Sequence, residues 1–105
     1  MTDRRKLPNR RAAETLNFRA DGHYYVATVG RFVETGEVSE VFVNTAMRQG
    51  SAADVNVADA AVAVSLALQY GCPLEVLASG MKRDPGNHPQ GPIGKILDIL
   101  LVKGE

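Results

Sequence analysis

The sequence predicts an α+β domain in which a three-stranded antiparallel meander packs on one long central helix plus two shorter C-terminal helices. Three observations support this class. Residues 14–45 alternate apolar and polar side chains and are divided by two turn-forming segments. Residues 51–71, SAADVNVADAAVAVSLALQYG, are largely apolar, begin at a helix cap and end at a glycine. Two shorter segments with helical spacing follow, and each begins at a proline.

The first two strands are predicted around a tight turn. Residues 14–20 alternate, with Leu16 and Phe18 on the apolar side. Asp21-Gly22 comes next, a pair that favours a two-residue type I′ turn because both central positions need a positive φ. Residues 24–32, YYVATVGRF, are rich in β-branched and aromatic side chains and form the second predicted strand.

A second turn and a third strand complete the predicted meander. Gly30, inside the second strand, is typical of a β-bulge. Residues 34–37, ETGE, form a turn, and residues 38–45 again alternate. Three consecutive strands joined by short turns predict an antiparallel sheet in chain order.

The long helix is predicted between Ser51 and Tyr70. Ser51 with Asp54 resembles a capping box in which Asp replaces the usual Glu. Gly71 stands where a left-handed residue commonly ends a helix. Because nearly every face of this helix is apolar, we expect other elements to surround it and the domain core to form around it.

Two short helices are predicted after it. Pro73 suits the first turn of a helix that extends to Met81. Residues 82–92 contain three prolines and two glycines and predict an exposed loop. Pro92 then begins a third helix, whose short length means that packing must stabilise it.

Composition and charge limit the classes of protein. With 105 residues there is room for one domain, and we expect a single domain over residues 14–105 after a flexible basic arm over residues 1–13. The arm has a net charge of +4, although the whole chain is formally neutral. The polar N-terminal segment does not resemble a secretory signal, and Asp54 and Asp59 interrupt the most apolar segment. We therefore expect a cytoplasmic protein without a membrane span.

Few residues are candidates for catalysis. His23 and His88 lie far apart in sequence and form no HxxxH or HExxH pattern, so we interpret them as exposed loop or edge residues without a metal. Cys72 is the only cysteine, which excludes an intramolecular disulfide and a multi-cysteine zinc site. It is either a nucleophile at a helix start or a small apolar residue at a helix corner, and the second interpretation is favoured.

Two features suggest anion binding. Arg48, Gly50 and Ser51 precede the long helix, where free backbone N–H groups and the helix dipole attract phosphate. The other interpretation is an ordinary strand-to-helix turn, since no P-loop pattern is present.

The second feature is the arm, whose cations could contact nucleic acid or an acidic partner. The other interpretation is a solubilising tail or a linker. It is favoured because the arm contains no aromatic residue that could stack on bases. Its five cations are Arg4, Arg5, Lys6, Arg10 and Arg11.

Several segments together resemble the TSCPD domain found at the C-terminus of adenosylcobalamin-dependent (class II) ribonucleotide reductases. The resemblance covers nearly the whole chain from Leu7, and the run SLALQYG-x-PLE is its most specific part. The matching segments are residues 7–11, 22–23, 27–32, 37–43, 50–54, 64–75 and 91–98. The chain departs from the family because it has neither the Thr-Ser-Cys-Pro-Asp stretch nor the cysteine-rich tail.

The resemblance implies a non-catalytic accessory or regulatory domain in deoxyribonucleotide synthesis. Its implied partners are a ribonucleotide reductase large chain and a second copy of itself. No cofactor is expected on this chain, because cobalamin binds the catalytic barrel of the larger relatives. A small nucleotide- or nucleic-acid-binding module that uses the arm and the Arg48–Ser51 loop is the alternative, and an enzyme that uses Cys72 is the least favoured interpretation.

Overall fold

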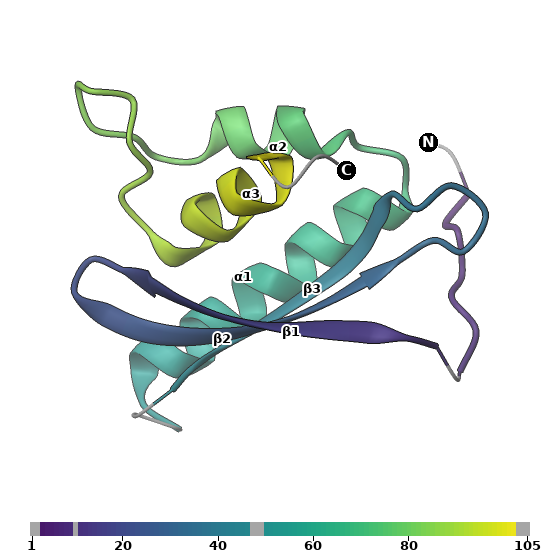
Figure 1. Ribbon diagram of the computed structural model, residues 1–105, viewed down its shortest axis with the longest axis horizontal. Helices are drawn as coiled ribbons and strands as arrows, with labels where there is room; N and C mark the ends of the chain where they lie inside the picture. The colour runs from purple at the N-terminus through teal and green to yellow at the C-terminus, as the bar shows by residue number, and fades with distance from the viewer. Residues whose placement is uncertain (1–2, 10, 47–49, 103–105) are drawn as a thin grey trace.

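The computed structural model describes residues 3–9, 11–46 and 50–102 and confirms the predicted α+β class (Figure 1). Three strands form one antiparallel sheet in the order β1-β2-β3: β1 (Ala13–Ala20), β2 (His23–Arg31) and β3 (Val38–Thr45). Three helices follow in the chain: α1 (Ala52–Gln69), α2 (Leu74–Gly80) and α3 (Pro92–Val102). The predicted ends of the strands differ from the observed ends by at most one residue.

Local sequence signals determine the turn and the bulge of the sheet. Asp21 and Gly22 have φ angles of 52° and 78°, as a type I′ turn requires, so this prediction is confirmed. The pairing of β2 with β3 shifts between Gly30 and Arg31, which confirms the predicted bulge and leaves Ser39 as the extra residue.

The sheet has one covered face and one open face. On the covered face the alternating side chains pack against the helices. They are Phe18, Tyr25, Ala27, Val29, Val41 and Val43, all buried. The open face carries exposed side chains of every strand, namely Thr15, Asn17, Arg19, Tyr24, Phe42 and Asn44.

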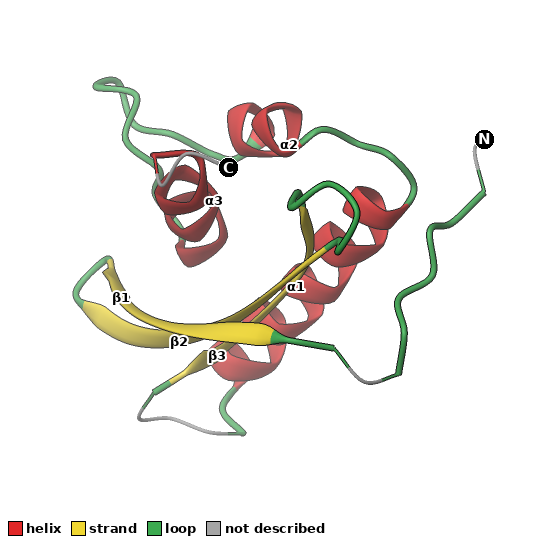
Figure 2. Cartoon of the chain, turned by 45° about the vertical axis from the view of Figure 1, so that its right-hand side comes forward, coloured by secondary structure: helices red, strands yellow, loops and turns green. Residues whose placement is uncertain are grey.

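Helix α1 lies along β3 (Figures 1 and 2). Its side chains form hydrogen bonds with backbone groups on the outer edge of that strand. The Ser65 hydroxyl accepts a hydrogen bond from the Val41 N–H at 2.8 Å and donates to the Val41 carbonyl at 2.9 Å. The Gln69 side-chain amide donates to the Ser39 carbonyl at 3.1 Å. These side chains pair backbone groups that an edge strand otherwise presents to another chain.

Both predicted caps of α1 are confirmed. The Ser51 hydroxyl accepts from the Asp54 N–H at 3.2 Å. Gly71 has a φ of 98°, and the Cys72 N–H donates to the Ala67 carbonyl at 2.9 Å. This pattern is a Schellman motif, in which a left-handed residue lets the chain turn back over the last helical turn.

The prediction that α1 is surrounded on all sides is wrong. Its buried apolar side chains, Val57, Ala61, Val64 and Leu68, lie on one face of the helix. Three other apolar side chains are exposed: Val55 by 50%, Val62 by 45% and Leu66 by 39%. Three strands and two short helices cover only one side of an 18-residue helix, so the apolar composition alone overestimated its burial.

The expectation about membrane spans concerns the same helix. With 18 residues and a mean hydropathy of 1.2, α1 is long and apolar enough to cross a membrane by length and composition alone. In this structure it is instead packed on β3, and the three polar side chains Asp54, Ser65 and Gln69 lie on its buried face.

The C-terminal helices cover the rest of the core. Helix α2 packs on α3, and α3 contacts α1 and β1 (Figure 2). Ile96 and Leu97 of α3 are fully buried. The predicted loop before α3 is tied to this helix, because the Arg83 guanidinium bonds both oxygens of Asp98, at 2.7 and 3.0 Å.

Candidate functional site

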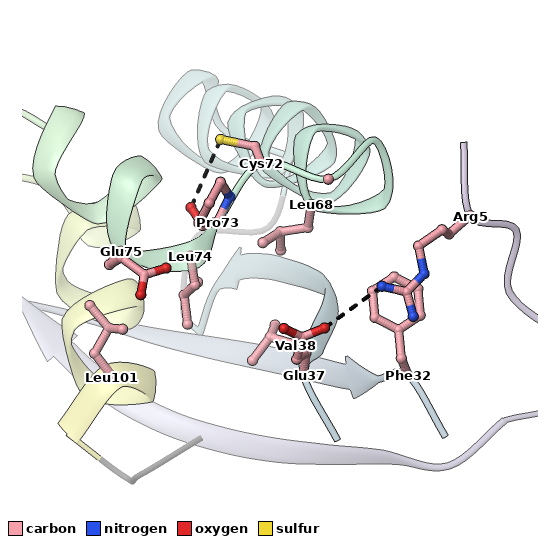
Figure 3. A pocket seen from close by; sticks show the side chains of 11 residues that line it. Arg5, Phe32, Glu37, Val38, Leu68, Cys72, Pro73, Leu74, Glu75 and Leu101 are labelled. Carbon is pink, nitrogen blue, oxygen red and sulfur yellow. Dashed lines mark hydrogen bonds and ion pairs between the residues drawn. The ribbon is translucent and has the colours of Figure 1, made fainter. Parts of the chain in front are cut away.

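Two of the hollows in the structure bring the N-terminal segment together with residues of α1. The first has a volume of about 280 Å³ and lies between the α1–α2 corner, the β2–β3 turn and the end of α3 (Figure 3). Leu68, Leu74 and Leu101 line its apolar part. Arg5 and Glu37 line its polar part.

Arg5 joins the N-terminal segment to the first hollow. Its guanidinium lies over the Phe32 ring, 3.5 Å from the centroid, and 3.7 Å from the Glu37 carboxylate (Figure 3). Its backbone N–H donates to the Gln69 carbonyl at 2.8 Å. The Phe32 ring and the Glu37 carboxylate hold the charged end of the Arg5 side chain. The backbone hydrogen bond to Gln69 holds the residue at its other end.

Cys72 lines the first hollow, but its sulfur bonds only weakly to the chain. The thiol lies 3.8 Å from the Pro73 carbonyl oxygen and is partly exposed (Figure 3). Among the described residues, neither histidine contacts it: His23 begins β2, and His88 pairs with Asp84 at 3.3 Å. Among the described residues, Cys72 therefore has no histidine beside it of the kind that activates a catalytic thiol.

No metal site is found in the part of the chain that the structure describes, since no three His, Cys, Asp or Glu side chains lie together there.

The second hollow has a volume of about 340 Å³ and lies between the N-terminal segment, β3 and α1. Its apolar lining comes from all three, namely Leu7, Phe42, Val62 and Leu66. Basic side chains of the N-terminal segment line one side of it, including Arg4 and Lys6.

Two polar contacts hold the N-terminal segment against this second hollow. The Arg4 Nε donates to the Gln69 side-chain oxygen at 2.7 Å. The Arg11 guanidinium forms a bidentate pair with the buried Glu40 carboxylate, with an Nη2–Oε1 distance of 2.9 Å. The hydrogen bonds that Arg11 donates to Glu40 raise the pKa of Arg11 above its ordinary value.

The predicted anion site before α1 contains a carboxylate. The Gly50 N–H donates to the Asp54 side chain at 2.8 Å, and the Ser51 hydroxyl accepts from the Asp54 N–H. The N–H groups of Gly50 and Thr45 hold the pKa of Asp54 below its usual value of 3.8, so Asp54 is negatively charged at neutral pH. Arg48 lies outside the described residues, and anion binding here stays a prediction.

The predicted basic arm contacts the domain body at several points. Arg4, Arg5 and Arg11 have partners within the chain, as given above, and Lys6 lines the second hollow. Arg10 lies outside the described residues. Contact of these cations with nucleic acid stays a prediction.

Sequence reasoning missed the second hollow. Val62 and Leu66 belong to the helix that was expected to be surrounded, because apolar side chains usually lie in the interior. A signal was present: polar residues of α1, Asp54, Ser65 and Gln69, share one helical face. Had that face been recognised as a contact with strand backbone, the apolar side chains on only one side of it would have been assigned to the core.

Comparison with known proteins relates this chain to part of one kind of enzyme. No family model matches the sequence, and no solved structure matches it. The vitamin B12-dependent ribonucleotide reductase of Agrobacterium fabrum is 35% identical over 92 residues, which cover 85% of this chain and 7% of that protein. The enzyme of the same name from Bradyrhizobium diazoefficiens is 35% identical over 75 residues, 71% of this chain and 6% of that protein. The chain is thus related to a short region of vitamin B12-dependent ribonucleotide reductases and spans less than a tenth of their length.

Proposed function

We propose that this chain is a non-catalytic accessory domain in deoxyribonucleotide synthesis that associates with a ribonucleotide reductase chain. The observation that carries the proposal is the match itself: 85% of this chain aligns with only 7% of the Agrobacterium fabrum reductase. A unit that recurs as a small part of a large enzyme is suited to contact with that enzyme.

The chemistry of the described residues supports an accessory role. No described histidine lies beside Cys72, and the polar pairs of the domain, such as Arg11–Glu40 and Arg83–Asp98, link its segments to one another. The exposed apolar side chains of α1 and β3 give the domain a surface for protein contacts. In this proposal the chain works in the cytoplasm and binds no cofactor, and cobalamin belongs to the larger protein.

The test is a binding measurement with the Agrobacterium fabrum reductase. Two forms of the reductase are prepared, the full enzyme and a form without the 92-residue matching region, and each is titrated with the labelled chain. We expect the shortened form to bind with a dissociation constant of about 1–10 μM and the full enzyme to bind more weakly, since its own region competes. An unrelated protein of similar charge serves as the control. Absence of binding to both forms at about 100 μM would contradict the proposal.

The same preparation tests the nucleic-acid alternative. Salt-dependent binding of DNA or RNA that is lost when residues 1–11 are removed would favour that alternative. We expect no such binding, because three of the arm's arginines already have partners within the chain.

We also propose that the chain forms a homodimer. Its sheet has an open face, and one side of α1 is exposed beside it. Surfaces of this kind commonly pair between identical chains.

A further inference from the structure

One side of α1 presents a continuous row of exposed residues, which we call the α1 stripe: Val55, Asp59, Val62 and Leu66. Their spacing of four, three and four residues places them on one face of the helix. The neighbouring face, which carries Ser65 and Gln69, packs on β3. Phe42, 42% exposed on the open face of the sheet, lines the second hollow together with Val62 and Leu66 and extends the apolar surface.

Opposite charges lie toward the two ends of the α1 stripe. Asp59 is in the N-terminal half of α1, whereas Arg4 and Lys6 lie beside Leu66 near the C-terminal end, where Arg4 bonds Gln69. Ten residues separate Asp59 from Gln69, about 15 Å along a helix. Within the described residues, neither Asp59 nor Lys6 takes part in an ion pair.

We propose that two copies of this chain pair through their α1 stripes, antiparallel and about a two-fold axis near Val62. In this arrangement Asp59 of each copy faces the Leu66 end of the other, next to the other copy's Lys6. The contact is isologous, so the same ion pair forms twice. A parallel pairing would place Asp59 against Asp59, which like-charge repulsion disfavours. The charge pattern therefore selects a second copy in one orientation.

The two edges of the sheet are less suitable for pairing with a second copy. The β3 edge is already bonded by Ser65 and Gln69 of α1. The β1 edge is exposed, but four of its exposed side chains are polar or charged, which opposes edge-to-edge pairing: Glu14, Thr15, Asn17 and Arg19. The α1 stripe offers three exposed apolar side chains within two turns on either side of the proposed axis.

This inference rests on the self-association proposed above and not on binding to a reductase. One helix pair with flanking side chains makes a small interface, so we expect a dissociation constant of about 1–100 μM. Sedimentation equilibrium on the full 105-residue chain, at several concentrations in this range, measures it directly.

Charge exchange tests the orientation. We expect Asp59→Lys and Lys6→Glu each to weaken the dimer about tenfold, since each places like charges together twice. The double variant, which exchanges the two charges, should restore dimerisation to near the unmodified level. Circular dichroism checks that each variant is folded.

A substitution on the axis tests the surface itself. Val62→Glu brings two carboxylates together and should give a monomer at about 100 μM. Val76→Glu on α2 is the matched control, because Val76 is a similarly exposed valine away from the α1 stripe, and the dimer should persist.

Three results would overturn the pairing: an unmodified chain that is monomeric at about 1 mM, a dimer that survives Val62→Glu, or a charge exchange that fails to recover dimerisation. Survival of the dimer in Val62→Glu would place the contact elsewhere, with the β1 edge the next candidate. None of these results depends on a reductase, so failure here is distinct from failure of the proposed function.

Discussion

A single glycine makes room for a buried carboxylate that pairs with an arginine of a distant segment. Gly30 of β2 pairs with Glu40 of β3, and the Glu40 side chain lies across the space where a side chain at position 30 would be. Glu40 is 4% exposed and reaches Arg11 just before β1. A buried carboxylate is tolerated only when it is paired and hydrogen-bonded, so the absence of a β-carbon at Gly30 is what makes this arrangement possible.

Replacing Gly30 with alanine should therefore destabilise the domain. A β-carbon there would lie 2.6 Å from the Glu40 Oε2 and 2.8 Å from its Cγ, so the Glu40 side chain must move away from Arg11. We expect a loss of about 1–3 kcal/mol in the free energy of unfolding, measured by urea denaturation. Gly80→Ala is the control, because nothing lies within 4 Å of its added carbon. Equal stability of the two variants would show that Glu40 adjusts freely.

At the scale of elements, α1 acts as a cover for the β3 edge. Three of its polar side chains, Asp54, Ser65 and Gln69, bond to backbone groups of β3 along most of the strand's length. Charges or bulges usually prevent an edge strand from pairing with another chain, whereas here a helix provides hydrogen bonds to the edge. The consequence is that self-association by extension of the sheet can occur only at β1.

The removal of Ser65 tests this role of α1. Ser65→Ala should lower the free energy of unfolding by about 1–3 kcal/mol, because the Val41 N–H and carbonyl would lose their partner while buried. Ser79→Ala on α2 is the matched control, since its hydroxyl is exposed and bonds only the Val76 carbonyl. A Ser65→Ala variant as stable as Ser79→Ala would mean that water replaces the lost bonds.

The same side chain should also affect aggregation. If α1 protects the β3 edge, Ser65→Ala should increase thioflavin binding on prolonged incubation, whereas the Ser79→Ala control should not.

At the scale of the whole molecule, polar contacts join segments that are far apart in sequence. Arg4 and Arg5 contact the end of α1, and Arg83 contacts Asp98 of α3. These links connect the N-terminal segment and the loop before α3 to the core. The Arg83–Asp98 link contains a carboxylate that titrates in acid, so the stability of the domain depends on pH.

Acid should weaken the domain through three carboxylates. Hydrogen bonds from Gly50, from the His88 N–H and from Arg83 lower the pKa values of Asp54, Asp84 and Asp98 respectively below 3.8. A lowered folded-state pKa means that the stabilisation is fully present above about pH 3.8 and is lost as the pH falls through the folded-state values. The urea concentration at which half of the protein is unfolded should therefore decrease as the pH is lowered from neutral through this range.

An Asp54→Asn variant provides the internal check on this pH dependence. It removes one of the three titrating groups, so its midpoint should start lower at neutral pH and decline less steeply in acid. A midpoint of the unmodified chain that stays constant throughout the acid range would contradict the assignment.

Local signals in the sequence by themselves determined the elements and their ends. The Asp21-Gly22 turn, the Ser51 cap and the Gly71 terminus depend on the φ angles and hydrogen bonds of adjacent residues, which the residue types select directly. The order of the strands followed as well, because short turns join neighbours in the sheet.

Only the tertiary structure decided which side of α1 is exposed, which arginines of the N-terminal segment have partners and why Gly30 is needed. Each of these depends on contacts between residues that are 10 to 65 positions apart, and these contacts are set by how the sheet and helices pack. An apolar residue such as Val62 has the same local propensity whether it is buried or exposed, so its exposure is decided by the number of elements available to cover it.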